Sequence, residues 1–387
     1  MLKLSLKGII PLLFLLMPSW ASAEKLTILH INDHHSHLEA NGSMGLDLDG
    51  ESTRTKSGGF PSVITKIKEL RSENPNSLTL HAGDATSGTL YFTLFEGEAD
   101  AALMNSVCFD AFVVGNHEFN NGDQGLVTFL DYLKEGNCQT PVLGANVQPE
   151  VGVSPLAKSS ADDYIQPYTV VERNGEKIGI IGIVISKKTK MSSNPDDNTM
   201  FLDEVSTAQK YTDELNSQGV DRVILLSHFG YENDLALAQK TSGIDIIVGG
   251  DSHSLLGDLS DLGLKPSGSY PTMVNDASGN DVCVVTAWEY SQIVGELHAE
   301  FDGQGNITSC MGTPHMMLAD SFKRKNADGE RVEIEEGYRD AVYSVIKVNP
   351  SLSIVEPDAD AQALLAGYSS KIDEFSSKII GSVSEDL

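Results

Sequence analysis

The chain has 387 residues, 40% of them hydrophobic, and its 55 Asp and Glu against 27 Lys and Arg give a formal net charge of −28. This composition supplies enough apolar material for the core of one large domain or two, which excludes a wholly disordered chain. The acidic balance argues against a nucleic-acid duplex or an anionic membrane as partner, because too few positive charges are present to neutralise a surface of phosphates.

Residues 1–23 are typical of an export signal. Lys3 and Lys7 precede an apolar run over residues 8–17, and the Ala-Ser-Ala that follows matches the small-residue pattern of a signal-peptidase site. A stable membrane anchor is disfavoured, because the run is well short of the about 20 residues that a spanning helix needs. We therefore expect a periplasmic or secreted chain that begins at Glu24.

Five apolar runs are typical of buried strands, and polar side chains follow each of them. The runs cover residues 26–31, 77–82, 111–115, 222–226 and 244–250. The polar residues at their ends are Asp33 and His35, Asp84, Asn116, His228, and Asp251 and His253. We expect these strand ends to meet on one rim. Oxygen and imidazole donors without a thiolate suit divalent ions such as Mn, Zn, Co, Mg or Fe, and one carboxylate, that of Asp84, can bridge two of them.

The segments between these runs predict an alternating α/β fold. Helical spacing of apolar residues predicts helices over residues 61–73, 89–108, 125–134 and 206–218. Residues rich in Gly, Asp, Ser and Pro predict loops over 41–59, 151–168 and 257–281. A hairpin is predicted from 168–174 and 177–184, and the last strands from 284–290 and 294–301.

The four cysteines permit three pairings, and an exported protein favours disulfides. Cys108 and Cys138 each precede a predicted strand, so they lie side by side if those strands are parallel neighbours. Cys283 and Cys310 flank two consecutive strands, which makes a local pair reasonable. Free buried thiols remain the alternative, because spacing alone does not fix connectivity.

The polar blocks resemble, in order, the motifs of the calcineurin-like metallophosphoesterase superfamily: D-x-H, GD, GNH[ED], a lone His and GHxH. Within this superfamily the chain is similar to the periplasmic 5'-nucleotidase branch, which includes secreted NAD nucleotidases. Further matching residues are Asn32, the Gly58-Gly59-Phe60 triplet, Gly115 to Phe119, and Trp288-Glu289-Tyr290 ahead of Val294-Gly295.

The resemblance implies a fold and an activity. The fold is a two-sheet metallophosphoesterase sandwich flanked by helices over residues 24–350. Residues 351–387 would form a linker helix, for which 358–377 show an amphipathic pattern, and the start of a missing C-terminal nucleotide-binding domain. The activity is that of an exported two-metal phosphohydrolase of the 5'-nucleotidase or NAD pyrophosphatase type. It cleaves nucleotide phosphate esters or anhydrides by attack of a hydroxide that bridges the two ions.

The resemblance also assigns roles to residues. Metal site one would use Asp33, His35, Asp84 and His253. Metal site two would use Asp84, Asn116, His228 and Asp251. His117 would stabilise transition-state charge or protonate the leaving group. Among the other histidines, His37 could reach the site, whereas His34 and His30 are expected to be structural or exposed.

Two positions depart from the family pattern. Asp251 stands where the GHxH motif has a histidine, and its extra negative charge favours Mn, Mg or Fe somewhat over Zn. Asn120 stands where an aspartate normally pairs with the catalytic histidine, and Asp123 could substitute for it. Asn120 and the missing domain leave open a metal-loaded nucleotide- or phosphate-binding module with impaired catalysis. A structural surface protein is a third alternative, and the oligomeric state stays open.

Overall fold

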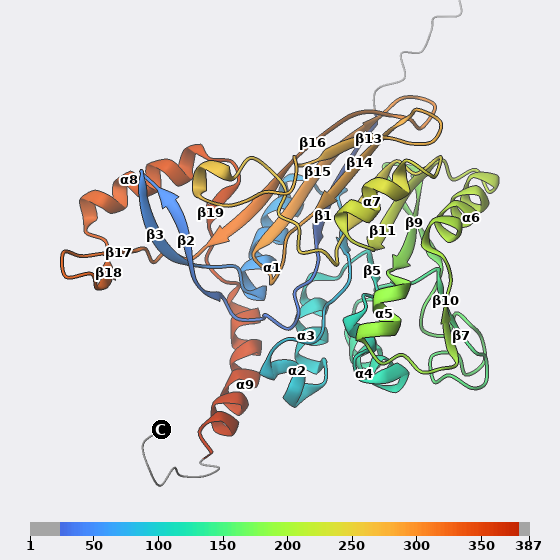
Figure 1. Cartoon of the computed structure of the whole chain (residues 1–387), viewed down its shortest axis with the longest axis horizontal. Helices are drawn as coiled ribbons and strands as arrows, with labels where there is room; N and C mark the ends of the chain where they lie inside the picture. Colours follow the sequence, from blue (N-terminus) through green and yellow to red (C-terminus); the bar gives the residue numbers. More distant parts are fainter. Residues whose placement is uncertain (1–23, 379–387) are drawn as a thin grey trace, which may run out of the picture.

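A computed structural model describes residues 24–378, so the predicted signal peptide and residues 379–387 lie outside the described residues (Figure 1). Two β-sheets pack face to face, and helices cover their outer faces. This is the α/β sandwich expected from the sequence.

The larger sheet has eleven strands, and its order is β18-β17-β3-β16-β15-β1-β4-β5-β6, with β2 beside β3 and β19 beside β16. The strands are β1 (Glu24–Ile31), β2 (Asn41–Leu48), β3 (Glu51–Ser57), β4 (Leu78–His81), β5 (Ala111–Val113), β6 (Val142–Leu143), β15 (Ile293–Phe301), β16 (Ile307–Leu318), β17 (Lys323–Lys325), β18 (Arg331–Glu333) and β19 (Leu352–Ile354). Neighbours among β1, β4, β5 and β6 are parallel, so their carboxyl ends share one edge.

The smaller sheet has six strands in the order β13-β14-β12-β11-β9-β8. Its strands are β8 (Tyr168–Arg173), β9 (Glu176–Val184), β11 (Arg222–His228), β12 (Ile246–Gly249), β13 (Thr272–Asn275) and β14 (Asp281–Thr286). Strands β9, β11, β12 and β14 are parallel, and β8 and β9 form the predicted hairpin. A separate pair joins β7 (Val147–Pro149) to β10 (Thr199–Phe201).

Alternation of side chains along the strands explains the layers. On β1, Leu26 and Ile28 face a buried cluster shared by both sheets, whereas Leu29 and Ile31 belong to the cluster beneath the helices. Successive residues of a strand point to opposite faces, so an apolar run buries both faces at once. The central strands therefore lie between two apolar layers, and the candidate ligands lie at or just beyond the carboxyl ends of these strands.

The helices cover the two outer faces. They are α1 (Phe60–Glu73), α2 (Leu90–Phe95), α3 (Glu98–Val107), α4 (Gly122–Glu135), α5 (Ser186–Ser192), α6 (Glu204–Ser217), α7 (Tyr231–Ala238), α8 (Glu336–Val348) and α9 (Ala359–Ser376), with short 3₁₀ helices at His117–Phe119 and Ser260–Leu262. Helices α1, α3 and α4 share a core with the larger sheet. Helices α6 and α7 share one with the smaller sheet.

Four sequence predictions were wrong in detail. Residues 41–59 were expected to form a loop, but they contain the β2–β3 hairpin, whose few apolar residues gave only a weak alternating pattern. The predicted helix 89–108 is two helices, because Glu96 and Gly97 hold positive φ angles of 50° and 93°. The loop 257–281 contains β13, and the strand expected over 284–290 ends at Thr286.

Both favoured disulfides are present. Cys108 joins Cys138 beside the parallel pair β5 and β6, with a Cα–Cα distance of 5.3 Å. Cys283 on β14 joins Cys310 on β16, so this bond connects the smaller sheet to the larger one.

Helix α9 follows β19 and extends away from the sandwich in Figure 1. Asp358 caps it by accepting a hydrogen bond from the Ala361 amide at 3.0 Å, and it also pairs with Lys68 of α1. Only Ala361 and Leu365 of this helix are buried. None of the helices in the described part of the chain combines the length and apolar composition that a bilayer crossing requires.

Candidate metal centre

The seven candidate ligands gather at the edge where the parallel strands of both sheets end. Those of the larger sheet follow β1, β4 and β5, and those of the smaller sheet follow β11 and β12. Five of the seven hold positive φ angles of 47° to 72°, a region that is uncommon and strained for residues other than glycine. These five are Asp33, His35, Asp84, Asp251 and His253. Such strain is typical of functional sites.

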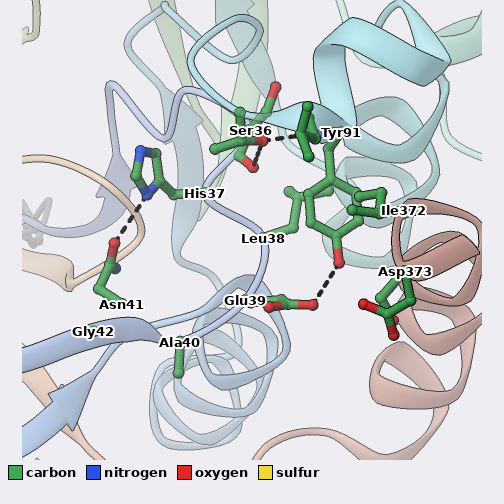
Figure 2. Close-up of a pocket in the computed structure, with 13 residues that line it drawn as sticks. Ser36, His37, Leu38, Glu39, Ala40, Asn41, Gly42, Tyr91, Ile372 and Asp373 are labelled. Carbon is green, nitrogen blue, oxygen red and sulfur yellow. Dashed lines mark hydrogen bonds between the residues drawn. The ribbon is translucent and has the colours of Figure 1, made fainter. Parts of the chain in front are cut away.

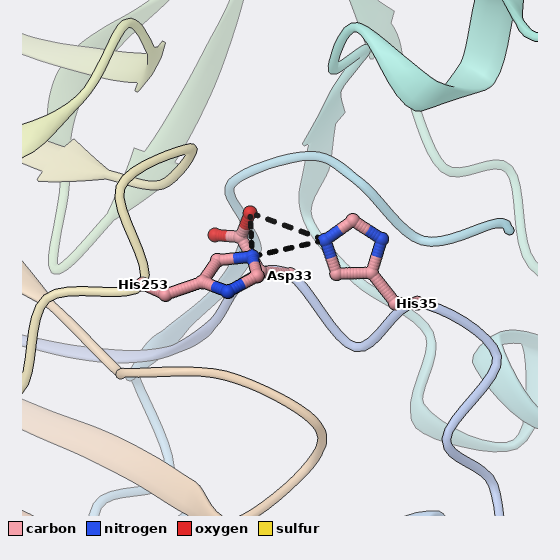
Figure 3. Close-up of side chains that lie close together, drawn as sticks. All are labelled: Asp33, His35 and His253. Atoms are coloured by element: carbon pink, nitrogen blue, oxygen red, sulfur yellow. Dashed lines mark hydrogen bonds and ion pairs between the residues drawn. The ribbon is translucent and has the colours of Figure 1, made fainter. Parts of the chain in front are cut away.

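Asp33, His35 and His253 form the first group of converging atoms (Figure 3). The Nε2 atoms of the two imidazoles lie 3.0 Å apart. Asp33 Oδ1 lies 3.4 Å from Nε2 of His253 and 3.7 Å from Nε2 of His35. Three ligand atoms from two different sheets therefore face one point.

Asp84 lies between this group and a second one. Its Oδ2 atom is 3.6 Å from His35 Nε2 and 3.0 Å from His228 Nε2. His228 Nε2 is in turn 3.7 Å from Asp251 Oδ1. Asp84 is thus placed to contribute to both groups.

Two buried polar atoms show that this pocket fits a cation. The ring nitrogen Nδ1 of His228 donates to the Ala82 carbonyl at 2.7 Å, so Nε2 is the ring nitrogen that faces the carboxylates of Asp84 and Asp251. The side-chain oxygen of Asn116 lies 3.0 Å from Asp251 Oδ1, and only an exchange of the amide oxygen and nitrogen would turn this contact into a hydrogen bond. Acceptors that face one another without a donor are what a cation satisfies.

Backbone donors and neighbouring side chains hold the ligands in place. The buried Glu118 carboxylate accepts from the amides of Asp84, Ala85, Thr86 and Gly115 at 2.6–3.0 Å, and so fixes the loops that carry Asp84 and Asn116. Asn32 donates to Asp33 Oδ2 at 2.7 Å. Glu289 Oε2 lies 2.6 Å from His253 Nδ1, which leaves Nε2 of that ring for the centre.

The carboxylates give the pocket a strongly negative character. Burial works against charge on His253, but Asp33 and Glu289 raise its pKa to about 10. Burial also works against charge on Asp84, but the His228 imidazole beside it lowers the pKa of this carboxyl. Metal-free, the cluster attracts protons to its imidazoles, and the same potential favours divalent cations.

His117 lies beside this cluster and forms a third group with His35 and Asp84. Its amide donates to Asp84 Oδ1 at 2.8 Å. Its Nδ1 lies 2.9 Å from Asn120 Nδ2 and 3.2 Å from Ser87 Oγ, so Nε2 remains for the pocket. Burial lowers the pKa of His117, which favours the neutral imidazole.

The predicted substitute for the missing aspartate was wrong. The buried Asp123 carboxylate accepts hydrogen bonds from Ser154 Oγ at 2.7 Å, Thr199 Oγ1 at 2.5 Å and the Asp196 amide at 3.1 Å. These contacts fix the loop around residue 196, and none of them involves His117. Asn120 itself is the neighbour of the histidine.

The remaining histidines near the site are either buried or line the pocket. His30 and His34 are fully buried, as the structural alternative predicted. His37 stacks on Tyr290 with ring centroids 4.1 Å apart, and both line the metal pocket. This pocket has a volume of about 450 Å³ and is lined by His35, His37, Asp84, Ser87, Gly88, His117, Lys188, Asp251, Ser252, His253 and Tyr290.

His37 also lines a second cavity of about 390 Å³ (Figure 2). Residues 36–42, the start of α2 and the end of α9 line it. Tyr91 donates to Glu39 Oε1 across it at 2.7 Å, and Asp373 approaches from α9. Because His37 lines both cavities, the cavity that α9 lines adjoins the metal pocket.

Sequence reasoning missed two charged residues of the site, Glu118 and Lys188. Lys188 Nζ on α5 lies 2.5 Å from Asp251 Oδ1, although 63 residues separate the two. Three lysines at 187, 188 and 190 are indistinguishable by sequence. Glu118 is within the GNHEF block, but its role depends on amides of another loop, which no local pattern reveals.

Comparisons with known proteins agree with this geometry. The family described as calcineurin-like phosphoesterase matches residues 26–255. The chain is 42% identical to a probable 5'-nucleotidase of Treponema pallidum and 40% identical to the NAD 5'-nucleotidase of Haemophilus influenzae, each over 94% of this chain. It spans only 60% and 59% of the length of these two relatives.

Solved structures give the same picture. The NAD nucleotidase of Haemophilus influenzae superposes with a TM-score of 0.87 at 40% identity, covering 93% of this chain and 70% of that one. A 5'-nucleotidase precursor of Thermus thermophilus superposes with a TM-score of 0.74 at 33% identity, covering 92% of this chain and 61% of that one.

Proposed function

Because the chain belongs to the calcineurin-like phosphoesterase family, we propose that it is a metal-dependent hydrolase of nucleotide phosphate esters or anhydrides. The observation that carries this proposal is the position of Asp84 Oδ2, 3.6 Å and 3.0 Å from imidazoles of two neighbouring ligand groups. The names of the relatives, 5'-nucleotidase and NAD 5'-nucleotidase, support nucleotides as the substrate class.

We assign the ligands as two sites. The first comprises Asp33, His35, Asp84 and His253. The second comprises Asp84, Asn116, His228 and Asp251. Divalent ions bound there, with Mn, Zn, Co, Mg and Fe as candidates, would neutralise phosphoryl charge and lower the pKa of a water molecule.

In this proposal His117 stabilises transition-state charge or protonates the leaving group. Its Nδ1 is engaged by Asn120 and Ser87, so Nε2 is the atom available to hold or pass a proton in the pocket. Asn120 orients the ring by a hydrogen bond but adds no charge that would raise the pKa of His117. Replacing Asn120 by Asp should therefore shift the acidic side of the pH profile without changing the metal content.

Export and domain organisation complete the proposal. We place the chain in the periplasm or outside the cell after removal of residues 1–23, with 24–350 as the metallophosphoesterase unit and 351–387 as a linker helix and the beginning of a nucleotide-binding domain. The two disulfides favour an oxidising compartment. Amino-terminal sequencing of the exported protein should give Glu24, and a retained Met1 would contradict export.

The alternative is a phosphate-binding module with impaired catalysis, and Asn120 at the catalytic position is what favours it. Steady-state hydrolysis of p-nitrophenyl phosphate, AMP and NAD by the Mn-loaded chain separates the two. We expect turnover of all three with little dependence on the base. Binding of AMP without hydrolysis of any of the three, measured as phosphate released from the two esters and as mononucleotides released from NAD, would support the alternative.

A further inference from the structure

The metal pocket has an unequal charge balance. Asp84 and Asp251 line it, and Asp33 lies directly behind its imidazoles. Among the described residues that line this pocket, Lys188 is the one Lys or Arg. A phosphate group that enters the pocket therefore meets a single lysine ammonium group, in a chain whose formal net charge is −28.

Lys188 is held at the rim by its helix. Helix α5 begins directly after β9, and the Ile185 amide that precedes the helix donates to the His228 carbonyl at 2.8 Å. This bond fixes the start of the helix to the strand that carries a candidate ligand. The Lys188 side chain is 39% exposed, whereas that of Asp251 is 9% exposed. The ammonium group can therefore move without disturbing the core.

The oxygen atom that Lys188 contacts is the one that the second ligand group also uses. Asp251 Oδ1 lies 2.5 Å from Lys188 Nζ, 3.0 Å from the Asn116 side-chain oxygen and 3.7 Å from His228 Nε2. A cation held by Asp251, Asn116 and His228 would compete with Lys188 for this Asp251 oxygen. It would also repel the ammonium group at close range.

We propose that Lys188 is a counter-ion that exchanges partners: it holds Asp251 in the metal-free pocket and binds the substrate phosphate once divalent ions occupy the site. The inference rests on the proposed function for the identity of the substrate. A lysine suits the task, because its compact charge sits on a flexible four-carbon stem that can reach either partner.

Removing the charge of Lys188 should change the affinity for phosphate and the affinity for Mn differently. In Lys188→Gln, the Mn-loaded protein loses a charged hydrogen bond to phosphate. We expect its affinity for inorganic phosphate to fall by on the order of 10- to 100-fold. The metal-free protein loses a competitor for Asp251, so its affinity for Mn should stay the same or increase.

Isothermal titration calorimetry with Mn alone, and with inorganic phosphate added to the Mn-loaded protein, measures both quantities without turnover. Lys187→Gln is the matched control, because this neighbour on the same helix is exposed and lies outside the pocket lining. It should change neither affinity. Lys188→Arg keeps the charge and should restore much of the phosphate affinity.

Two outcomes would overturn the inference. An unchanged phosphate affinity in Lys188→Gln would show that the ammonium group never reaches the phosphate. A fall in both affinities would indicate that Lys188 only maintains the shape of the pocket. Absence of hydrolysis in the unsubstituted chain, with the calorimetric pattern intact, would instead remove the proposed function and leave the role of Lys188 in place.

Discussion

The two sheets contribute different kinds of ligand to the same centre. Asp33, Asp84 and Asn116 from the larger sheet are fully or almost fully buried, and backbone amides donate to the two carboxylates. Of the ligands from the smaller sheet, His228 is also fully buried, whereas Asp251 and His253 are more exposed and are held by the side chains of Lys188 and Glu289. The buried half of the centre is fixed by the fold itself, and the more exposed half, Asp251 and His253, is held by side-chain ion pairs. We expect substitutions in the buried half to have the larger effects.

The sharpest test of the buried half is Asp84→Asn. The substitution keeps the acceptor for the His117 amide but removes the charge that both ligand groups share. We expect the protein to bind neither ion stably and turnover to fall by on the order of 10⁴-fold or more. Metal content by mass spectrometry, measured with hydrolysis of p-nitrophenyl phosphate, checks both. One ion retained at full occupancy would mean that Asp84 does not serve both sites.

His117→Ala tests the residue that lies between the halves. The ring is not among the proposed ligands, so the metal content should be unchanged. Turnover should fall by about 10²- to 10⁴-fold, as expected when a positioned proton donor is removed. Ser87→Ala, which removes the second contact of Nδ1, is the comparison and should have a smaller effect. An unchanged rate in His117→Ala would mean that another residue protonates the leaving group.

Paired substitutions of two glutamates compare the halves directly. Glu118→Gln keeps one acceptor oxygen but places an amide NH2 group against two of the four backbone donors, and we expect it to lower the free energy of unfolding by about 1–3 kcal/mol. Glu289→Gln should leave that free energy nearly unchanged and weaken Mn binding by about 10- to 100-fold. Urea unfolding of the metal-free proteins and calorimetry with Mn provide the measurements. Equal loss of stability in both variants would break the distinction between the halves.

A test outside the centre concerns Glu296, which lies between His298 and His315 at 3.3 Å and 2.9 Å. Burial opposes its charge, but both imidazoles lower the pKa of Glu296 from 4.5 to about 2. This stabilisation is complete above about pH 4.5 and is lost as the pH falls towards 2. It amounts to at most about 3 kcal/mol.

Urea unfolding at several pH values tests this contribution. Glu296→Gln should unfold with a flatter dependence on pH between 4.5 and 2 than the unsubstituted protein. The hydrogen bond to Glu296 raises the pKa of His298. The contribution of His298 to the free energy of unfolding is therefore complete below pH 6.5 and is lost as the pH rises above it. Glu300→Gln, on the same strand, is the control. Identical profiles for Glu296→Gln and the unsubstituted protein would exclude the pairing.

The difference between the halves also explains what the sequence could predict. Ligands such as Asp33, Asp84 and His228 follow buried apolar strands, and that local pattern identifies both the strand and the position of the side chain. Lys188 contacts Asp251 across 63 residues of chain, and only the assembled fold brings the two together. The β2–β3 hairpin escaped prediction for a related reason. It has a solvated face, and its buried Thr53 and Thr55 carry no hydrophobic signal.

The two disulfides have a consequence for the way the chain is made. Their partners are 30 and 27 residues apart, and the second pair begins long after the first has ended. Neither bond encloses or crosses the other. A polypeptide that emerges from its amino end into an oxidising space presents Cys138 while only Cys108 is available, and Cys310 when only Cys283 remains unpaired. The order of synthesis alone therefore favours the native connectivity, and reshuffling by an isomerase should be dispensable.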